Sequence, residues 1–533
     1  MPRLLALLLL TGCSGAPLLG GSSVFTPSAR EVEVYDVFEV EARPPVAAKG
    51  NPFVDATFRG RFQRAGEPAV DVDGFYDGDV FRIRFMPSRF GEHVYALTLN
   101  AFNRTFETKG TFKAKEARRR GPVRVDKVYP WHFVWEGTGE RFLWNSTTAY
   151  GLLGWDDATM KEAVDRLAAL KVNRIRVGLT WRMKNPLPSP RFTMTFGPWR
   201  ADRPLDVENP GYDVKRFDLD LWSKAERLAR HAREKDVALS FIFYVDGARK
   251  GTDPFGTAGM GGEDEKRYYR YAAARLGAFS NVMWDLANEY RLFRNDLWAE
   301  AMGTFLKEVD PYDHLTSVHG HADFKFHGSI WADYAAYQSW DEEGGHGFML
   351  QARRAQAAGG RIMPQVNEEY GFEDHYPAGG RRAPARDAES RRRIAWGIAM
   401  AGGHQTTGER TTGAKKDSGG GWINGRGDAS MAMLVGYARL SAFLSGVEAW
   451  RLEPRDELAR NEAYCLAEPG RRYVLYQPEG RPATLQLEPG RYKVRRFDPR
   501  TGAWTDLPAV EGSRFSAPEA PSPDDWALVL DRS

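Results

Sequence analysis

The fold is decided by a short stretch in the middle of the chain, NVMWDLANEY, at residues 281–290. The run from Val282 to Leu286 is short and mostly apolar, as expected for a buried strand of a parallel sheet. It ends at the polar pair Asn288-Glu289. Segments with apolar residues at helical spacing lie between runs of this kind, so the stretch is one copy of a strand-and-helix repeat.

Counting these repeats predicts the architecture of the central region. A helix-like segment carries Met160, Val164 and Leu167 on one face, and similar segments separate the other runs. Eight strands with helices between them favour a closed (β/α)8 barrel, although a doubly wound open sheet gives a similar alternation. The strand candidates are Phe142–Asn145, Arg174–Val177, Ala238–Phe243, Val282–Leu286, Leu315–Val318, Tyr334–Gln338, Ile362–Val366 and Gly403–Thr407.

The two ends of the chain show the period of two that is typical of strands in antiparallel sheets. Near the start, Glu31–Tyr35 and Phe81–Phe85 alternate and are separated by turn signals, and beyond residue 451 Tyr473–Tyr476 and Trp526–Leu530 do the same. We therefore predict a multidomain protein, in which a central TIM barrel is flanked by an N-terminal and a C-terminal β-sandwich. The expected divisions are residues 1–23 (signal peptide and tether), 24–118 (first sandwich), 119–450 (barrel) and 451–533 (second sandwich).

The first residues indicate export. Arg3 precedes an apolar run from Leu4 to Leu10 that is too short to span a bilayer as a mature helix, which is typical of a signal peptide. The run ends in LTGC at residues 10–13 and resembles the lipobox of bacterial lipoproteins. That resemblance implies lipidation of Cys13 and anchoring at the cell envelope, in the outer membrane or at the cell surface. The alternative is a free Cys13 beside an ordinary cleavage site. Cys465 is the only other cysteine, so no intrachain disulfide is expected.

Composition excludes several other classes of protein. The 74 Lys and Arg residues nearly balance 71 Asp and Glu, and the absence of a long run of one sign gives no support to nucleic-acid binding. His319, His321 and His327 match no zinc-site spacing, so we predict no metal. The chain also lacks a Gly-rich phosphate loop and a Gly-x-Ser-x-Gly elbow, so no cofactor and no serine hydrolase are expected.

Acidic residues follow two of the predicted barrel strands, where the active site of such a barrel lies. Glu289 follows the fourth strand, and Glu368 and Glu369 follow the seventh. Hydrolysis of a glycosidic bond needs one carboxyl that protonates the leaving oxygen and a second that attacks the sugar or activates water. Taken alone, Asn288-Glu289 also suits a helix N-terminus, because Asn caps helices and Glu favours the first turn.

This pattern resembles the large clan of retaining (β/α)8 glycosidases, whose acid/base follows strand 4 and whose nucleophile follows strand 7. The resemblance rests on Asn288-Glu289, on Glu369 followed by Tyr-Gly, and on Arg176 in the stretch NRIRV. It implies that Glu289 is the acid/base, Glu369 the nucleophile and Arg176 its orienting partner. It also implies that Asn288 donates to the sugar 2-hydroxyl.

Elementary chemistry leads to the same roles. A guanidinium near Glu369 would keep that carboxyl ionised, whereas Glu289 must stay protonated until the leaving group departs and must then act as a base. Glu368 competes for the nucleophile role, because only one of two neighbours on a regular strand points into the cleft, and the likeness selects Glu369. A gap of about 5 to 5.5 Å between the carboxyls predicts retention, and about 6.5 Å or more predicts inversion.

Further substrate contacts are expected around the same end of the barrel. Stacking platforms, hydrogen-bonding residues and a subsite wall are all candidates, while His319 and Gln338 equally suit a structural role. Long loops at about 181–215 and 408–428 are expected to shape the cleft. The candidates are Tyr150 and Trp155 after the first strand, Trp181 and Tyr244 at the ends of the second and third, His319 and Gln338 after the fifth and sixth, and His404 and Glu409 at or after the eighth.

The flanks extend the resemblance over nearly the whole mature chain. The stretches NPFVD (51–55) and VDGFYDG (72–78) look like the immunoglobulin-like module joined to apiosidase-like barrels, and RFDPRTGAW (496–504) is similar to their collagen-binding-type C-terminal sandwich. The resemblance points to bacterial proteins that dismantle plant or algal polysaccharides. Apiosidases place aspartate where this chain has Glu289, so the family name is used here for fold and apiose is not implied as the substrate.

The predicted function is therefore that of an O-glycosyl hydrolase (EC 3.2.1.-). We expect it to cleave a β-linked glycoside of a complex polysaccharide or oligosaccharide by double displacement, with retention of configuration. Two alternatives remain. One is a non-catalytic glycan-binding lipoprotein at the cell surface, and the other is a structural adhesin that uses both sandwiches to bind protein.

Overall fold

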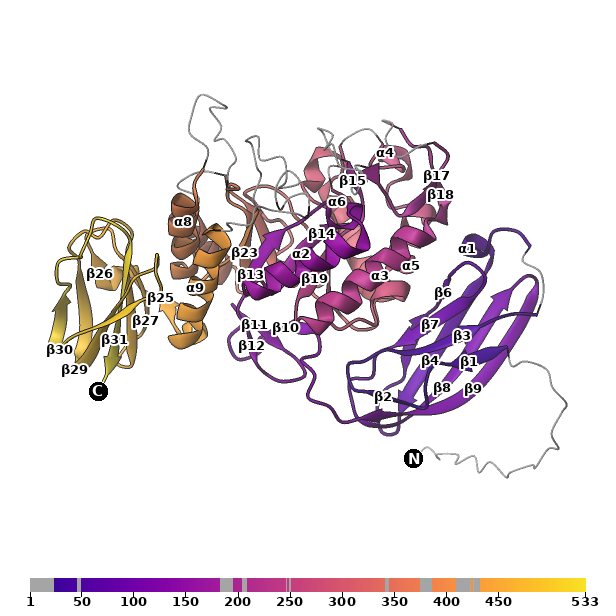
Figure 1. Cartoon of the computed structure of the whole chain (residues 1–533), viewed down its shortest axis with the longest axis horizontal. Helices are drawn as coiled ribbons and strands as arrows, with labels where there is room; N and C mark the ends of the chain where they lie inside the picture. Colours follow the sequence, from indigo (N-terminus) through magenta and orange to yellow (C-terminus); the bar gives the residue numbers. More distant parts are fainter. Residues whose placement is uncertain are drawn as a thin grey trace, which may run out of the picture.

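The computed structural model describes residues 24–45, 49–182, 195–203, 209–245, 247–248, 251–340, 345–373, 386–408, 422, 425 and 432–533. Three domains follow one another along the chain, and the two β domains flank the central barrel on opposite sides (Figure 1). The predicted multidomain fold is confirmed. The expected lipidation site Cys13 and the expected subsite residue Glu409 lie outside the described residues.

The N-terminal domain consists of two sheets packed face to face. Their orders are β1-β3-β7-β6 and β2-β9-β8-β4-β5. Alternate residues of the longer strands point inward, and Phe38 stacks on Phe112 while Phe62 stacks on Phe85 between the sheets. The elements are β1 Phe25–Pro27, β2 Glu31–Glu33, β3 Phe38–Ala42, helix α1 Pro52–Asp55, β4 Thr57–Arg64, β5 Val70–Asp73, β6 Phe75–Tyr76, β7 Phe81–Phe85, β8 Gly91–Ala101 and β9 Arg104–Lys115.

The central domain is a barrel of eight parallel strands in the order β21-β20-β19-β14-β13-β24-β23-β22. The first and last strands of this order, β21 and β22, are joined by two hydrogen bonds. The Asp333 N–H donates to the Thr316 carbonyl at 2.9 Å, and the Ser317 hydroxyl donates to the Tyr334 carbonyl at 2.7 Å. The barrel is thus nearly closed. The strands are β13 Asn145–Thr148, β14 Arg174–Gly178, β19 Ala238–Ile242, β20 Val282–Asp285, β21 Thr316–Ser317, β22 Ala335–Gln338, β23 Gln365–Glu369 and β24 His404–Thr407.

Amphipathic helices cover the outside of the barrel. The fifth connection differs from expectation, because residues 318–334, all of which are described, join β21 to β22 without a helix. Two small hairpins follow β14: β15 Trp181–Arg182 with β16 Thr195–Phe196, and β17 Trp199–Ala201 with β18 Tyr212–Phe217. The helices are α2 Asp157–Ala169, α3 Leu219–Glu234, α4 Gly256–Gly259, α5 Glu263–Leu276, α6 Asp296–Val309, α7 His346–Ala358, α8 Ala388–Met400 and α9 Ala432–Gly446, with 3-10 turns η1 Leu152–Gly154 and η2 Tyr290–Leu292.

Two barrel strands begin three residues later than predicted. The apolar run at residues 142–145 lies mostly before β13, because Phe142 and Trp144 pack in an apolar cluster beneath the barrel. A small sheet of β10 Val123–Val125, β11 Phe133–Trp135 and β12 Arg141–Phe142 closes this floor. The strands themselves are polar (NSTT in β13, QVNEE in β23), since the barrel interior above the floor holds charged and hydroxyl side chains.

The C-terminal domain is an antiparallel β structure in the order β25-β27-β28-β31-β29-β26, with β30 paired to β29. The pairing of the long strand β29 with β30 is irregular after Gln486. The elements are η5 Ala449–Arg451, β25 Glu453–Pro454, η6 Asp456–Leu458, β26 Ala459–Arg460, β27 Tyr464–Glu468, β28 Arg472–Gln477, β29 Thr484–Phe497, β30 Trp504–Ser516 and β31 Trp526–Arg532.

Both β domains are docked onto the barrel by buried contacts. At the N-terminal interface the Arg84 guanidinium bonds Glu39 of its own domain, Glu226 of α3 and the Arg275 carbonyl. At the other interface Trp396 of α8 stacks on Tyr476 with ring centroids 5.0 Å apart. Among the described helices, none has the length and apolar character needed to cross a bilayer.

Candidate active site

The two predicted catalytic carboxylates meet at the C-terminal end of the barrel. Glu289 lies four residues beyond β20, and Glu369 is the last residue of β23. The side-chain nitrogen of Gln338, the last residue of β22, lies 3.0 Å from Glu289 Oε1 and 3.2 Å from Glu369 Oε2. These two carboxylate oxygens are therefore at most 6.2 Å apart.

Glu289 has an unusual backbone. Its φ of 49° and ψ of 46° lie in the left-handed region, which the backbone of a residue other than glycine rarely adopts. The residue is half-buried, and the 3-10 turn η2 begins directly after it. Such conformations persist where the surrounding structure enforces them, and they cluster at functional sites.

Glu369 is buried and receives donors on both oxygens. The Tyr150 hydroxyl lies 2.5 Å from its Oε1, and Gln338 donates to its Oε2. The Arg176 guanidinium is 3.9 Å from Oε1, within ion-pair range but beyond hydrogen-bond range. The predicted orienting effect of Arg176 would thus reach Glu369 largely through Tyr150, whose hydroxyl lies 3.2 Å from Arg176 Nη1.

Burial keeps Tyr150 in the form that donates. Burial first, and then the charge of Glu369, raise the pKa of the Tyr150 phenol well above its usual 10. The hydroxyl therefore stays protonated at neutral pH. Its proton belongs on the shorter of its two acceptor contacts, the one to Glu369.

Asn288 is held beside the carboxylates by three polar neighbours. Its Oδ1 lies 2.6 Å from His319 Nδ1, 2.8 Å from the Tyr150 hydroxyl and 3.1 Å from Arg176 Nη2. Burial, and then Arg176, lower the pKa of His319 well below 6.5, so its imidazole is neutral. A neutral His319 ring that donates from Nδ1, together with the Arg176 guanidinium, directs the amide oxygen of Asn288 toward these two donors and turns the amide nitrogen the other way.

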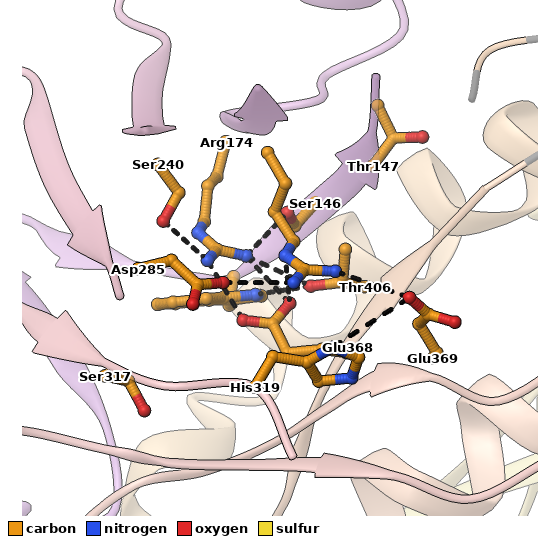
Figure 2. Close-up of polar contacts among 12 residues, drawn as sticks. Ser146, Thr147, Arg174, Ser240, Asp285, Ser317, His319, Glu368, Glu369 and Thr406 are labelled. Carbon is orange, nitrogen blue, oxygen red and sulfur yellow. Dashed lines mark hydrogen bonds and ion pairs between the residues drawn. The ribbon is translucent and has the colours of Figure 1, made fainter. Parts of the chain in front are cut away.

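Glu368 points into the barrel below the site. β23 contains a bulge, because Tyr337 pairs with Asn367 and Gln338 pairs with Glu369, so Glu368 is the extra residue. Bulges re-aim side chains next to active sites. Glu368 and Glu369 can therefore both face the barrel axis at different depths, which a regular strand does not allow (Figure 2).

A buried polar layer supports the site from beneath. Arg174 makes two bonds of 2.9 Å to Glu368 and further bonds to hydroxyls (Figure 2). Its guanidinium lies over the Trp144 ring, 4.2 Å from the centroid. Burial would raise the pKa of Glu368, but Arg174 and Arg176 outweigh burial and hold it below 4.5. The hydroxyl partners of Arg174 are Ser146, Ser240, Tyr334 and Thr406.

Asp285, which was not among the predicted site residues, connects this layer to the site. Its carboxylate is 3.0 Å from Arg176 Nη2 and is almost completely buried. Burial, opposed by Arg176, raises the pKa of Asp285 to about 6. The signal in the sequence was an acid within the otherwise apolar fourth strand, just as Arg174 and Arg176 stand out in the second strand.

The predicted aromatic platforms separate into two groups. Tyr150 contacts Glu369, and the Trp181 ring lies next to the Tyr150 ring, with centroids 5.7 Å apart. Tyr244 and Trp155 are completely or almost completely buried, and the Tyr244 hydroxyl donates to Glu265 in an outer cluster. The structure therefore gives no support to the stacking role predicted for Tyr244 and Trp155.

The predicted subsite role of His404 is wrong. His404 is the first residue of β24, so it lies at the opposite end of the barrel from the carboxylates. It contacts the Trp131 carbonyl at 2.9 Å and packs against Phe133 in the floor. The eighth strand was predicted at nearly the correct residues, but His404 is at its beginning and not at its end.

The described part of the chain contains no metal-binding cluster. No group of three or more His, Cys, Asp or Glu side chains there is placed to hold an ion. His319 is engaged with Asn288, and His327 lies against Tyr337.

Three family models match the chain. The model described as "Apiosidase-like, catalytic domain" matches residues 132–408. A "Domain of unknown function (DUF5060)" matches residues 31–100, and a "Putative collagen-binding domain of a collagenase" matches residues 455–531. A search of curated proteins finds no match.

Solved structures are similar to this chain in fold. The 1.80 Å crystal structure of a "putative glycoside hydrolase" from Bacteroides vulgatus ATCC 8482 aligns with a TM-score of 0.79 at 21% identity, over 95% of this chain and 100% of that one. A glycoside hydrolase family 5 structure from the same organism aligns with a TM-score of 0.60 at 14% identity, over 78% and 94%. At such identities the likeness concerns the fold.

Proposed function

The chain belongs to the family of apiosidase-like catalytic domains, and from this premise we propose that it is a glycoside hydrolase that retains configuration by double displacement. The observation that carries the proposal is the pair Glu289 and Glu369, held at the C-terminal end of the barrel by one shared amide. Glu289 Oε1 and Glu369 Oε2, the two oxygens that contact this amide, are at most 6.2 Å apart, which favours the shorter, retaining separation over the inverting one of about 6.5 to 9.5 Å.

In the first step Glu369 attacks the anomeric carbon. Its donors, Tyr150 and Gln338, hold the carboxylate in one orientation, so an oxygen faces the substrate. The bond from the anomeric carbon to the glycosidic oxygen breaks as the glycosyl–Glu369 ester forms. Glu289 gives its proton to the departing oxygen, which leaves as an alcohol.

In the second step water completes the hydrolysis. Glu289, now a carboxylate, takes a proton from a water molecule that attacks the anomeric carbon. The ester bond to Glu369 breaks and that carboxylate is regenerated. Two displacements on opposite faces of the sugar restore the original anomeric configuration.

The proposed substrate is a β-linked glycoside of a complex polysaccharide or oligosaccharide. Trp181 beside Tyr150 supplies an aromatic surface next to the nucleophile, and the Trp181 indole nitrogen has no hydrogen-bond partner among the described residues. Asn288 is placed to donate to a hydroxyl beside the anomeric carbon. These contacts suit a neutral, hydroxyl-rich ligand.

We also propose that the protein acts at the cell envelope. The basic start, the apolar run and Cys13 in LTGC support export and lipid anchoring. Metabolic labelling with an alkyne fatty acid should mark the wild type and leave Cys13→Ser unlabelled. Equal labelling of the two proteins would refute the anchor.

The proposed activity is tested with purified protein on a panel of aryl glycosides and cell-wall polysaccharides. Wild type should hydrolyse at least one member, and Glu289→Ala and Glu369→Ala should each lose at least about 1,000-fold in kcat. The matched control Glu162→Ala, an exposed glutamate on α2, should keep full activity. Glycan binding by the wild type without turnover of any bound glycan would instead favour the non-catalytic reading.

A further inference from the structure

Gln338 lies between the two carboxylates. Its amide nitrogen contacts one oxygen of each, at 3.0 and 3.2 Å, and the residue is only 9% exposed. An amide nitrogen carries two hydrogens, so one is available for each carboxylate. The reverse orientation would bring the amide oxygen against two carboxylate oxygens and is excluded by repulsion.

The remaining atom of the amide supports this orientation. Gln338 Oε1 is buried and has no hydrogen-bond partner among the described residues. A buried acceptor without a partner costs free energy, so the two donor contacts on the nitrogen must outweigh that cost. Cost of this kind is expected at a functional position rather than at one selected for packing.

The chemical type of the bridge also matters. Two carboxylates this close repel each other when both are ionised. A lysine or arginine between them would hold Glu289 in the ionised form and oppose its role as an acid. A neutral amide reduces the repulsion by donating to both oxygens, while leaving Glu289 able to take up and release a proton.

We propose that Gln338 is a positioning residue whose amide bridges the two carboxylates, sets the gap between them and donates to whichever of them carries the charge. The inference rests on the proposed function of the site. In the free enzyme the amide donates to the Glu369 nucleophile. When Glu369 has become an ester, its charge is gone, and the other hydrogen of the amide stabilises Glu289 as the carboxylate base.

β22 and β23 place the amide there through the bulge. Gln338 pairs with Glu369 only because Glu368 is skipped in the register. A regular pairing would set Gln338 opposite Glu368, whose carboxylate is already bonded to Arg174. The bulge therefore brings together a donor and a carboxylate that strand parity alone would separate.

The test is a titration of the two carboxyls in the full chain. Glutamate labelled with ¹³C at the carboxyl is followed by NMR against pH, and Glu289→Gln and Glu369→Gln assign the two signals. Gln338→Met keeps the size of the side chain but has no donor. Both titration midpoints should move up by about 1 pH unit, because each ionised carboxylate loses a donor.

A shorter variant and a matched control complete the design. Gln338→Asn keeps the amide, but its shorter side chain cannot reach both carboxylate oxygens. At least one of the two titration midpoints should therefore rise. This variant tests the bridge if Gln338→Met does not fold. Gln365→Met makes the same change at a buried amide at the start of β23 and should leave both midpoints in place. Folded Gln338 variants with unmoved midpoints would overturn the inference.

This titration requires no turnover. A wild type that hydrolyses no glycoside would count against the proposed function, whereas unmoved midpoints would count against the bridge. If the wild type is active, the pH profile of kcat/KM provides a second readout. Both limbs should move to higher pH in Gln338→Met, whereas a purely structural role would lower the profile without moving its limbs.

Discussion

At the scale of single residues, the site depends on neutral donors placed around acidic groups. Glu369 receives the Tyr150 hydroxyl and the Gln338 amide, while Arg176 remains 3.9 Å away. Charged hydrogen bonds of this kind are the strong ones, and they also fix orientation. The proposed nucleophile is therefore held by the hydroxyl of a residue that the sequence suggested only as a stacking platform.

Removing the tyrosine hydroxyl tests this arrangement. Tyr150→Phe should lower kcat/KM by about 10- to 100-fold, because a hydrogen bond to a charged group contributes about 1.5 to 3 kcal/mol. The acid limb of the pH profile should also move to higher pH, since ionised Glu369 loses a donor. Steady-state kinetics from pH 4 to 9 measure both effects.

A matched tyrosine separates this effect from a loss of packing. Tyr268 is also completely buried, but its hydroxyl donates to the Phe243 carbonyl in the outer layer of the barrel. Tyr268→Phe should leave the acid limb unchanged. If the limb of Tyr150→Phe also stayed in place, Tyr150 would not be the donor that matters.

At the scale of elements, the barrel interior is a polar layer between an apolar floor and the site. Arg174 and Arg176, two residues apart on β14, point inward and pair with Glu368 and Asp285. Buried ion pairs cost desolvation, so they are weak evidence for stability and better understood as fixing the geometry above them. Asp285 shows this cost most clearly, because burial raises its pKa to about 6.

The raised pKa gives a pH dependence of stability with a definite sign. In the folded state Asp285 binds its proton more tightly than in the unfolded chain, where the ordinary value is 3.8. Ionisation of this group therefore lowers the free energy of unfolding by up to about 3 kcal/mol as pH rises from about 4 to 6. Below pH 4 the effect is absent.

Asp285→Asn should remove this part of the slope. The substitution also changes the contact with Arg176, so the comparison concerns the change in unfolding free energy between pH 4 and 6 rather than its absolute value. Urea unfolding at half-unit steps of pH measures the free energy. A variant with the wild-type slope would show that Asp285 does not titrate in this window.

At the scale of the whole molecule, the two β domains bracket the barrel without lying in the polar network around the carboxylates. Among the described residues, that network comes from β14, β20, β22 and β23, their following turns, Tyr150 and His319. Both β domains are nevertheless attached through buried contacts, Arg84 on one side and Trp396 with Tyr476 on the other. Their effect on the barrel is therefore expected to be on stability.

Arg84 is the residue on which this docking can be tested. Its guanidinium is almost completely buried and pairs with Glu39 and Glu226, so Arg84→Met leaves two carboxylates without their partner. The expected loss is about 3 to 5 kcal/mol of unfolding free energy, read from denaturant midpoints. Arg59→Met, which removes an exposed guanidinium paired with Asp73, should cost less than about 1 kcal/mol. Equal effects would refute the docking role.

The sequence was sufficient to predict the order of the domains and the eight barrel strands. It misplaced β13 and β23 by three residues, because apolar runs mark the floor of this barrel while the strands themselves carry Ser, Thr, Asn and Glu. It found both glutamates from their positions after strands. It could not reveal the bulge at Glu368, since pairing register depends on the neighbouring strand β22 and is not encoded in a local pattern.

The central claim, that Glu369 attacks the sugar while Glu289 serves as acid and base, is tested most directly by trapping the intermediate. The enzyme is incubated with a 2-deoxy-2-fluoro glycoside of a sugar it hydrolyses, carrying an activated leaving group, and the peptides are then mapped by mass spectrometry. The account predicts one glycosyl adduct on Glu369 and none in Glu369→Gln. An adduct on Glu368, or hydrolysis with inverted configuration and no adduct, would contradict it.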